Sequence, residues 1–240
     1  KRKYLRRLAE VKKRARAEIS RLVGGTAGEG PISAGRVKVI NTLPYGREEI
    51  VRLRTMGTAR VAQADGTVIP SLCLPSWDDP SRTDLLFAAR VPSCGEAEYR
   101  ILADDARAAT GASCDETAVL AGTHEYAIGA DGTVRSVMVD GRSVLAGPGH
   151  DLHYLTPDGK LVGGPGRPGK MVRFRSDLGD VLRVSAPVGD VMAEIEFVAS
   201  PRHPFLVITT RLIFNGHEIG TMWEDWTKLN AYWPVTGRRS

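Results

Sequence analysis

The sequence predicts a mainly β protein, built as antiparallel sandwiches behind one N-terminal helix. From residue 36 onward, short segments that are rich in β-branched residues or alternate between apolar and polar residues follow one another closely. Asp-Gly and Asn-Gly pairs, which favour two-residue hairpin turns, separate several of these segments. No helical pattern alternates with them, as a parallel α/β fold would require. Antiparallel sandwiches are therefore the expected architecture.

The first 24 residues contain the predicted helix. Apolar residues recur at three- and four-residue steps along residues 4–22, at Tyr4, Leu8, Val11, Ala15, Ile19 and Leu22. Gly24-Gly25 is a typical helix terminator. Since a single apolar stripe must lie against another element, we interpret residues 1–24 as the remnant of a helical bundle whose partners are missing. The glycine-rich residues 24–35 are the expected linker.

Two β domains are expected after the linker. The predicted strands are residues 37–40, 50–53, 59–62, 85–91, 99–102, 134–139, 181–185, 193–198 and 205–214. The turn signals are Asp65-Gly66, Asp131-Gly132, Asp140-Gly141, Asp158-Gly159 and Asn215-Gly216. A change of composition at residues 103–116 divides a small sandwich, residues 36–102, from a larger one, residues 117–240.

One stretch of the larger sandwich is predicted to be a long loop. Residues 147–169 hold seven glycines and four prolines, too many for the interior of a sheet. The chain begins at Lys1 and stops shortly after the apolar run at residues 229–235, so we expect both ends to be cuts. The larger sandwich is then expected to be incomplete.

The net charge of +5 comes from the predicted helix. Residues 1–23 carry ten basic and two acidic side chains, which leaves a mildly acidic remainder. A dedicated nucleic-acid binder spreads basic residues over a surface, so this distribution argues against nucleic acid as a partner. The sequence has no apolar run of about 18 residues, as a membrane span needs, and no signal-peptide pattern. No membrane contact is expected.

The cysteines indicate a reducing compartment. Cys73, Cys94 and Cys114 form no CxxC pair, and their odd number and wide spacing suit neither a zinc knuckle nor a disulfide framework. We therefore expect reduced, buried thiols in a cytoplasmic protein.

Five segments of the chain occur in an order that is more specific than any one of them. They are VKVINTLPYGREEIVRL at residues 37–53, ADGTVIPS at 64–71, LLFAARVPSCGEAEYRI at 85–101, HEYAIGADGTVRSVMVDGRSVL at 124–145 and MWEDWTKLNAYWPV at 222–235. Together they resemble the β-sandwich region that follows the helical bundle in glycoside hydrolase family 38, the α-mannosidases. Within them, Asn41 and Pro44 are expected to shape a turn, and Gly95 to supply a positive φ.

The resemblance implies both a fold and a chemistry. The implied fold is a small sandwich followed by part of a galactose-mutarotase-like supersandwich. The family hydrolyses α-mannosides with retention in an N-terminal α/β barrel, which holds zinc with His and Asp residues and carries an Asp nucleophile. No segment of this chain resembles that barrel. We therefore expect the chain alone to be inactive and to contain no catalytic residue, metal ligand or cofactor, with the rest of the parent enzyme and carbohydrate as partners.

The expected carbohydrate contacts are aromatic residues with polar neighbours, because an aromatic ring packs against the C–H face of a pyranose. Trp77 is the candidate in a turn-rich loop, and Trp223, Glu224 and Trp226 are the candidates near the C-terminus. Asp78-Asp79 is interpreted as turn capping, since neighbours on an extended chain face opposite ways and do not build a glycosidase carboxylate pair.

Other functions stay open. A stand-alone sugar-binding module would use the same aromatic residues. A mutarotase-like sugar epimerase would need His150, His153 or Glu224 as general acid and base. In a third reading, the basic helix contacts an acidic partner or nucleic acid instead of being the solvated face of a bundle. His150 and His153 also have the spacing of a metal pair without an apparent third ligand, and GGPGRPGK at residues 163–170 lacks phosphate-loop spacing.

Overall fold

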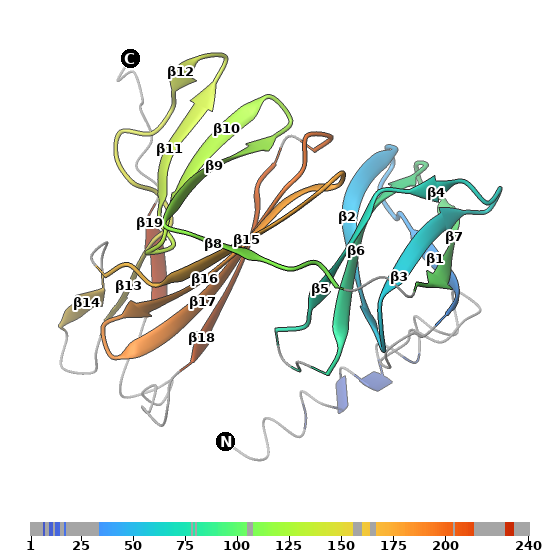
Figure 1. Cartoon of the computed structure of the whole chain (residues 1–240), viewed down its shortest axis with the longest axis horizontal. Helices are drawn as coiled ribbons and strands as arrows, with labels where there is room; N and C mark the ends of the chain where they lie inside the picture. Colours follow the sequence, from blue (N-terminus) through green and yellow to red (C-terminus); the bar gives the residue numbers. More distant parts are fainter. Residues whose placement is uncertain are drawn as a thin grey trace.

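The structure is a computed structural model of the chain. It describes residues 34–77, 79, 81–104, 108–155, 160–163, 167–203, 205–213 and 229–232, together with residues 7, 10, 11, 13, 14 and 17. The described part is mainly β, and its strands pair antiparallel, which confirms the predicted fold class (Figure 1). Among the described residues, none belongs to a helix with the length and apolar character needed to cross a membrane.

The small sandwich consists of a four-stranded and a three-stranded sheet. The four-stranded sheet has the order β1 (Gly35–Ile40), β7 (Glu96–Ala103), β3 (Ala59–Gln63) and β4 (Val68–Ile69). The three-stranded sheet has the order β2 (Arg47–Thr55), β6 (Thr83–Val91) and β5 (Ser71–Pro75). Val61 and Ile101 of one sheet meet Leu85 and Phe87 of the other in a buried core. Alternation along β6 leaves Leu86 for the opposite face.

The large sandwich is built around a five-stranded sheet. Its order is β18 (Val207–Ile213), β17 (Val191–Ala199), β16 (Gly179–Val188), β15 (Lys170–Ser176) and β8 (Ala112–Cys114). A four-stranded sheet covers one face in the order β12 (Arg142–Ser143), β11 (Val134–Val139), β10 (His124–Gly129) and β9 (Glu116–Ala121). Leu182, Ile195 and Phe197 meet Ile128 and Val134 between these sheets.

A third sheet packs onto the core of the large sandwich. Its order is β14 (Leu161–Gly163), β13 (Asp151–Leu155) and β19 (Leu229–Tyr232), and Leu152 of β13 joins the core. The loop predicted at residues 147–169 is therefore wrong in part, because β13 and β14 lie inside it. Pairing of β13 with the distant β19 supplies backbone hydrogen bonds that local composition does not reveal.

The two sandwiches meet face to face, and we call this contact the junction. The three-stranded sheet of the small sandwich packs against the face of the five-stranded sheet that the large core leaves open. The apolar side chains of the junction are Leu72, Leu74, Leu86, Phe174, Leu178, Val181 and Val198. Figure 1 shows the two bodies side by side, with β8 running between them. The large sandwich was expected to begin at residue 117. Since β8 pairs with β15, its five-stranded sheet already includes residues 112–114.

Turn chemistry agrees with the predictions at several strand ends. Asp65-Gly66, Asp131-Gly132 and Asp140-Gly141 lie in the turns β3–β4, β10–β11 and β11–β12, whereas Asp158-Gly159 and Asn215-Gly216 lie outside the described residues. Asn41 shapes a turn as predicted, since its Nδ2 donates to the carbonyls of Tyr45 and Pro92 at 2.7 and 2.9 Å.

The turn between β6 and β7 corrects two predictions. The positive φ expected at Gly95 belongs to Cys94, at 44°. Gly95 is needed for close packing instead, since a Cβ there would lie 2.7 Å from Cγ of Pro92. Cys94 is also exposed rather than buried, while Cys73 and Cys114 are partly buried, and all three thiols are free.

The described residues of the predicted helix are α-helical. They are Arg7, Glu10, Val11, Lys13, Arg14 and Ala17, and all six are exposed. Val11 belongs to the predicted apolar stripe and is 63% exposed, so no described residue covers it.

Candidate functional site

Charged side chains occupy the part of the junction next to its apolar contacts. Glu196 on β17 is fully buried and pairs with Arg52 of β2 and with Arg183 of β16, the latter at 2.9 Å from Nε. Asp84 on β6 is 3% exposed and lies 3.6 Å from Arg52 and 3.8 Å from Arg183. We call these four residues the junction ion cluster. Each sandwich supplies one acid and one base, so burial of either carboxylate depends on both sandwiches.

Trp77 lies beside this cluster, in the loop between β5 and β6. The guanidinium carbons of Arg183 and of Arg211 on β18 are 5.3 and 5.6 Å from the centroid of its ring, within the range of cation–π interactions. Arg211 also donates to the carbonyl of Trp77 at 3.5 Å and pairs with Glu194 of β17. The indole of the small sandwich is thereby held over the sheet of the large one.

A groove of about 200 Å³ opens beside the Trp77 ring. Its lining residues are Trp77, Lys170, Val172, Phe174, Arg183, Val184 and Ser185. Pockets for drug-sized ligands usually measure about 300–1,000 Å³, so this groove has room for one small ring. We call it the Trp77 groove.

The chemistry of the Trp77 groove suits a sugar. Apolar surface in the groove comes from Trp77, Val172 and Phe174. Surface of this kind can pack against the C–H face of a pyranose. Lys170 and Ser185 face each other across the β15–β16 ladder and provide an ammonium group and a hydroxyl for polar substituents. The groove therefore combines the two kinds of contact expected for carbohydrate, and it contains the predicted site residue Trp77.

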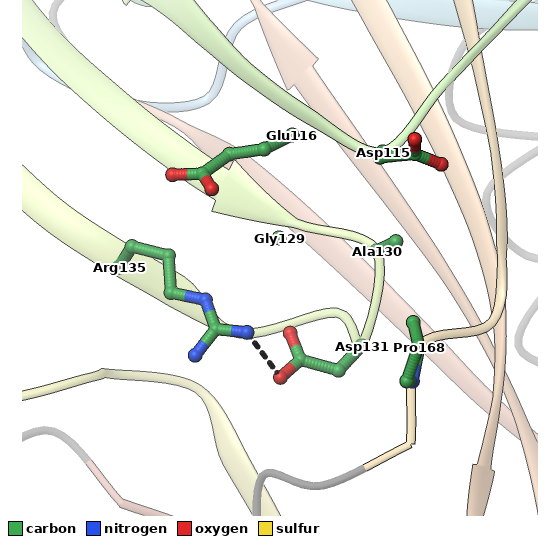
Figure 2. Close-up of a pocket in the computed structure, with 7 residues that line it drawn as sticks. All are labelled: Asp115, Glu116, Gly129, Ala130, Asp131, Arg135 and Pro168. Atoms are coloured by element: carbon green, nitrogen blue, oxygen red, sulfur yellow. Dashed lines mark hydrogen bonds and ion pairs between the residues drawn. The ribbon is translucent and has the colours of Figure 1, made fainter.

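A larger cavity of about 600 Å³ lies where β9, β10 and β11 approach the start of β15. Figure 2 shows the ion pair of Asp131 with Arg135 at one side, with Asp115 and Glu116 across from it. The Asp131 carboxylate is already occupied, because it accepts from Arg135 at 2.6 Å and from the Thr133 hydroxyl at 2.7 Å. None of the described residues that line this cavity is aromatic. It lacks the stacking surface that makes the Trp77 groove the better carbohydrate candidate.

The histidines considered for general acid and base catalysis have structural roles. His150 is 6% exposed, and its ring nitrogens lie 3.0 Å from the Gly132 carbonyl and 3.1 Å from the Thr210 hydroxyl. Burial lowers the pKa of His150, so the neutral ring is favoured. His153 lies on β13 and its Nε2 is 2.8 Å from Asp151. Both nitrogens of His150 are occupied, which argues against an epimerase centred on it.

The turn-capping interpretation of Asp79 is confirmed. Its carboxylate accepts from the backbone and hydroxyl of Ser81 and pairs with Arg82 at 2.9 Å. Hydrogen bonds from Ser81 lower the pKa of Asp79. The predicted contacts Trp223, Glu224 and Trp226 lie outside the described residues, as does Asp78.

Several residues of the site were not singled out from the sequence. In the sequence, Lys170 is only the last residue of GGPGRPGK. In the structure it begins strand β15, where a phosphate loop would have a helix. Arg183 and Ser185 were read simply as parts of a strand. Their positions two residues apart on β16 put them on one face, so a polar stripe within an apolar strand was the available signal.

Zinc is the metal that the family resemblance implies, so a zinc site would need a group of His, Cys, Asp or Glu ligands. Among them, no group of three or more His, Cys, Asp or Glu side chains is arranged to hold a metal ion. The described residues therefore do not fit zinc.

No protein-family model matches the chain, and no curated protein matches it significantly.

Proposed function

We propose that this chain is the non-catalytic β-sandwich region of an α-mannosidase-like enzyme of glycoside hydrolase family 38. In this proposal the parent protein hydrolyses α-mannosides with retention and uses zinc held in a separate catalytic domain. The sandwiches hold the enzyme together and bind carbohydrate in the Trp77 groove. The proposed partners are the rest of the parent enzyme and carbohydrate, and the proposed location is the cytoplasm.

The observation that carries the proposal is the order of the family-like segments along the strands. Residues 37–53 cover most of β1, the Asn41 turn and most of β2, and residues 85–101 cover most of β6 and β7 with their connecting turn. Residues 124–145 cover β10, β11 and β12 of the large sandwich. Each of these three segments corresponds to consecutive strands and their connecting turns, which supports a resemblance of fold as well as of sequence.

The junction supports a scaffolding role. Apolar packing and the junction ion cluster join the two sandwiches, so neither buries this surface by itself. Apolar contacts across an interface restrict the relative motion of two domains, and paired buried charges add contacts that suit one arrangement. A fixed pair of sandwiches is what a scaffold for a neighbouring catalytic domain requires.

The catalytic part of the proposal is tested with an aryl α-mannoside and added zinc. We expect residues 1–240 alone to give no hydrolysis above buffer, and the full protein encoded by the native gene to give robust hydrolysis with retention. Robust turnover by residues 1–240 contradicts the assignment of the chemistry to another domain. An inactive full protein without a zinc-ligand barrel upstream contradicts membership of the family.

The carbohydrate-binding part is tested by NMR titration of residues 1–240 with mannose. We expect the indole N–H signal of Trp77, assigned with Trp77→Phe, to shift on titration. Trp77→Ala weakens binding by about fivefold or more, because one aromatic stacking surface is lost. Tyr45→Ala is the matched control, since Tyr45 is 59% exposed and does not line the groove. Equal binding by the two variants contradicts a carbohydrate site at Trp77.

A further inference from the structure

The charges around the Trp77 groove point to the class of sugar that it takes. We propose that the groove binds an anionic sugar unit, whose phosphate or carboxylate pairs with Lys170 while its ring packs on Trp77. This inference rests on the proposed carbohydrate-binding function and makes it more specific.

The arginines near the groove already have carboxylate partners. Arg183 pairs with Glu196 at 2.9 Å and lies 3.8 Å from Asp84, and Arg211 pairs with Glu194. These groups hold Trp77 in place and largely cancel one another's charge. They therefore contribute little net attraction for a charged ligand.

Lys170 is different, because its side chain makes no ion pair or hydrogen bond with any residue in the part of the chain that the structure describes. Its side chain is exposed and lines the groove at the start of β15. An ammonium group with no internal carboxylate is available for a ligand anion, and it donates up to three hydrogen bonds. Lys170 thus gives the groove one positive charge that the junction does not neutralise.

The strand register brings the polar and apolar contacts within reach of one ligand. Lys170 is directly opposite Ser185 in the β15–β16 ladder, and opposite residues have Cβ atoms about 4.5–5.5 Å apart. Val172 is two residues along β15 and therefore lies on the same face as Lys170. A pyranose on the Trp77 and Val172 surface would place an exocyclic anionic group beside Lys170 and Ser185. The volume of about 200 Å³ leaves room for one such unit.

Isothermal titration calorimetry with four probes tests the inference: mannose, mannose 6-phosphate, glucuronate and inorganic phosphate. We expect at least one of the two anionic sugars to bind about fivefold more tightly than mannose at low salt, and this preference to shrink as salt is added. The sugar that gains identifies whether the anion is a phosphate or a carboxylate.

Lys170→Met should remove the preference for the anionic sugar, so that the variant binds this sugar and mannose with similar affinity. Lys13→Met is the matched control, because it removes one positive charge from an exposed position outside the groove and should preserve the preference. Ser185→Ala is a second test that changes no charge, and it should weaken the anionic sugar more than mannose.

The remaining outcomes of the titrations distinguish failure of this inference from failure of the proposed carbohydrate site. Equal affinity for mannose and both anionic sugars, with binding still dependent on Trp77, overturns this inference and leaves the proposed carbohydrate site intact. Inorganic phosphate that binds as tightly as mannose 6-phosphate also overturns it, since the sugar ring then contributes nothing. Absence of binding by all three sugars overturns the inference and the proposed carbohydrate site together.

Discussion

The two faces of the five-stranded sheet bury different kinds of side chain: one face is apolar, and the other includes a buried carboxylate. Phe197 and Glu196 are neighbours on β17, and both are fully buried, but they point to opposite faces. Phe197 packs among the aliphatic residues of the large core, with the ring of His150 at its edge. Glu196 instead enters the junction and is surrounded by the guanidinium groups of Arg52 and Arg183.

The two faces therefore differ in what they contribute: one to the stability of the large sandwich, the other to the relative arrangement of the two sandwiches. Burial of apolar area stabilises the large core whatever its exact partners, because the hydrophobic effect has no direction. The junction ion cluster adds little net stability, since the ions lose hydration. Its four charges are paired in the one arrangement of the sandwiches that the structure has. We therefore expect the apolar face to determine how stable the large sandwich is and the charged face to determine how the small one sits on it.

The largest expected effect is on the apolar face. Phe197→Ala should lower the free energy of unfolding by about 4 kcal/mol, because it removes a buried aromatic ring and leaves a cavity. Urea denaturation followed by circular dichroism measures the change. Phe205→Ala is the control, since Phe205 is 65% exposed, and it should change the free energy by less than about 0.5 kcal/mol. Similar losses in both variants would contradict the assigned core.

The next effect is on the charged face. Glu196→Gln should cost about 3 kcal/mol, because it leaves Arg52 and Arg183 with one buried carboxylate fewer. Glu194→Gln is the matched control, since its partner Arg211 is 37% exposed, and it should cost less than about 1 kcal/mol. Hydrogen exchange should also report loosening of the junction strands β2 and β16 in Glu196→Gln alone. Equal costs for the two variants would mean that the junction is open to water.

The smallest effect is a pH dependence on the apolar face. Burial lowers the pKa of His150 below its ordinary value near 6.5, while the hydrogen bond to Gly132 and the nearby Asp151 act in the opposite direction. The unfolded chain therefore takes up a proton at a higher pH than the folded one. The contribution of His150 to stability is complete above the unfolded pKa and is lost as pH falls toward the folded pKa.

His150→Gln should reduce this acid sensitivity. Free energies of unfolding measured at about pH 7.5 and 5.5 should differ less in the variant than in the natural sequence. His124→Gln is the control, because His124 at the start of β10 is only partly buried. An acid loss of unchanged size in His150→Gln would assign the effect to other groups.

The candidate site was only partly predictable. Trp77 is predicted as a carbohydrate contact because it is an aromatic residue in a turn-rich loop, and the structure places it in a groove. Its arginine partners were not identified, since Arg211 is separated from Trp77 by 134 positions. Lys170 was hidden in a glycine-rich run whose composition indicated only a loop. A partner that comes from another strand leaves no pattern in the local sequence.

The sequence by itself determined the local features of this protein. Alternation of apolar residues or enrichment in β-branched residues predicted β6, β16 and β17, and Asp-Gly pairs marked the turns β3–β4, β10–β11 and β11–β12. Both signals depend on residues that are close along the chain. Only the tertiary structure decided that β8 pairs with β15 and β13 with β19, and that Arg52 meets Glu196, 144 positions away. Those contacts depend on which faces remain uncovered once each sheet has formed, and that is a property of the packed molecule.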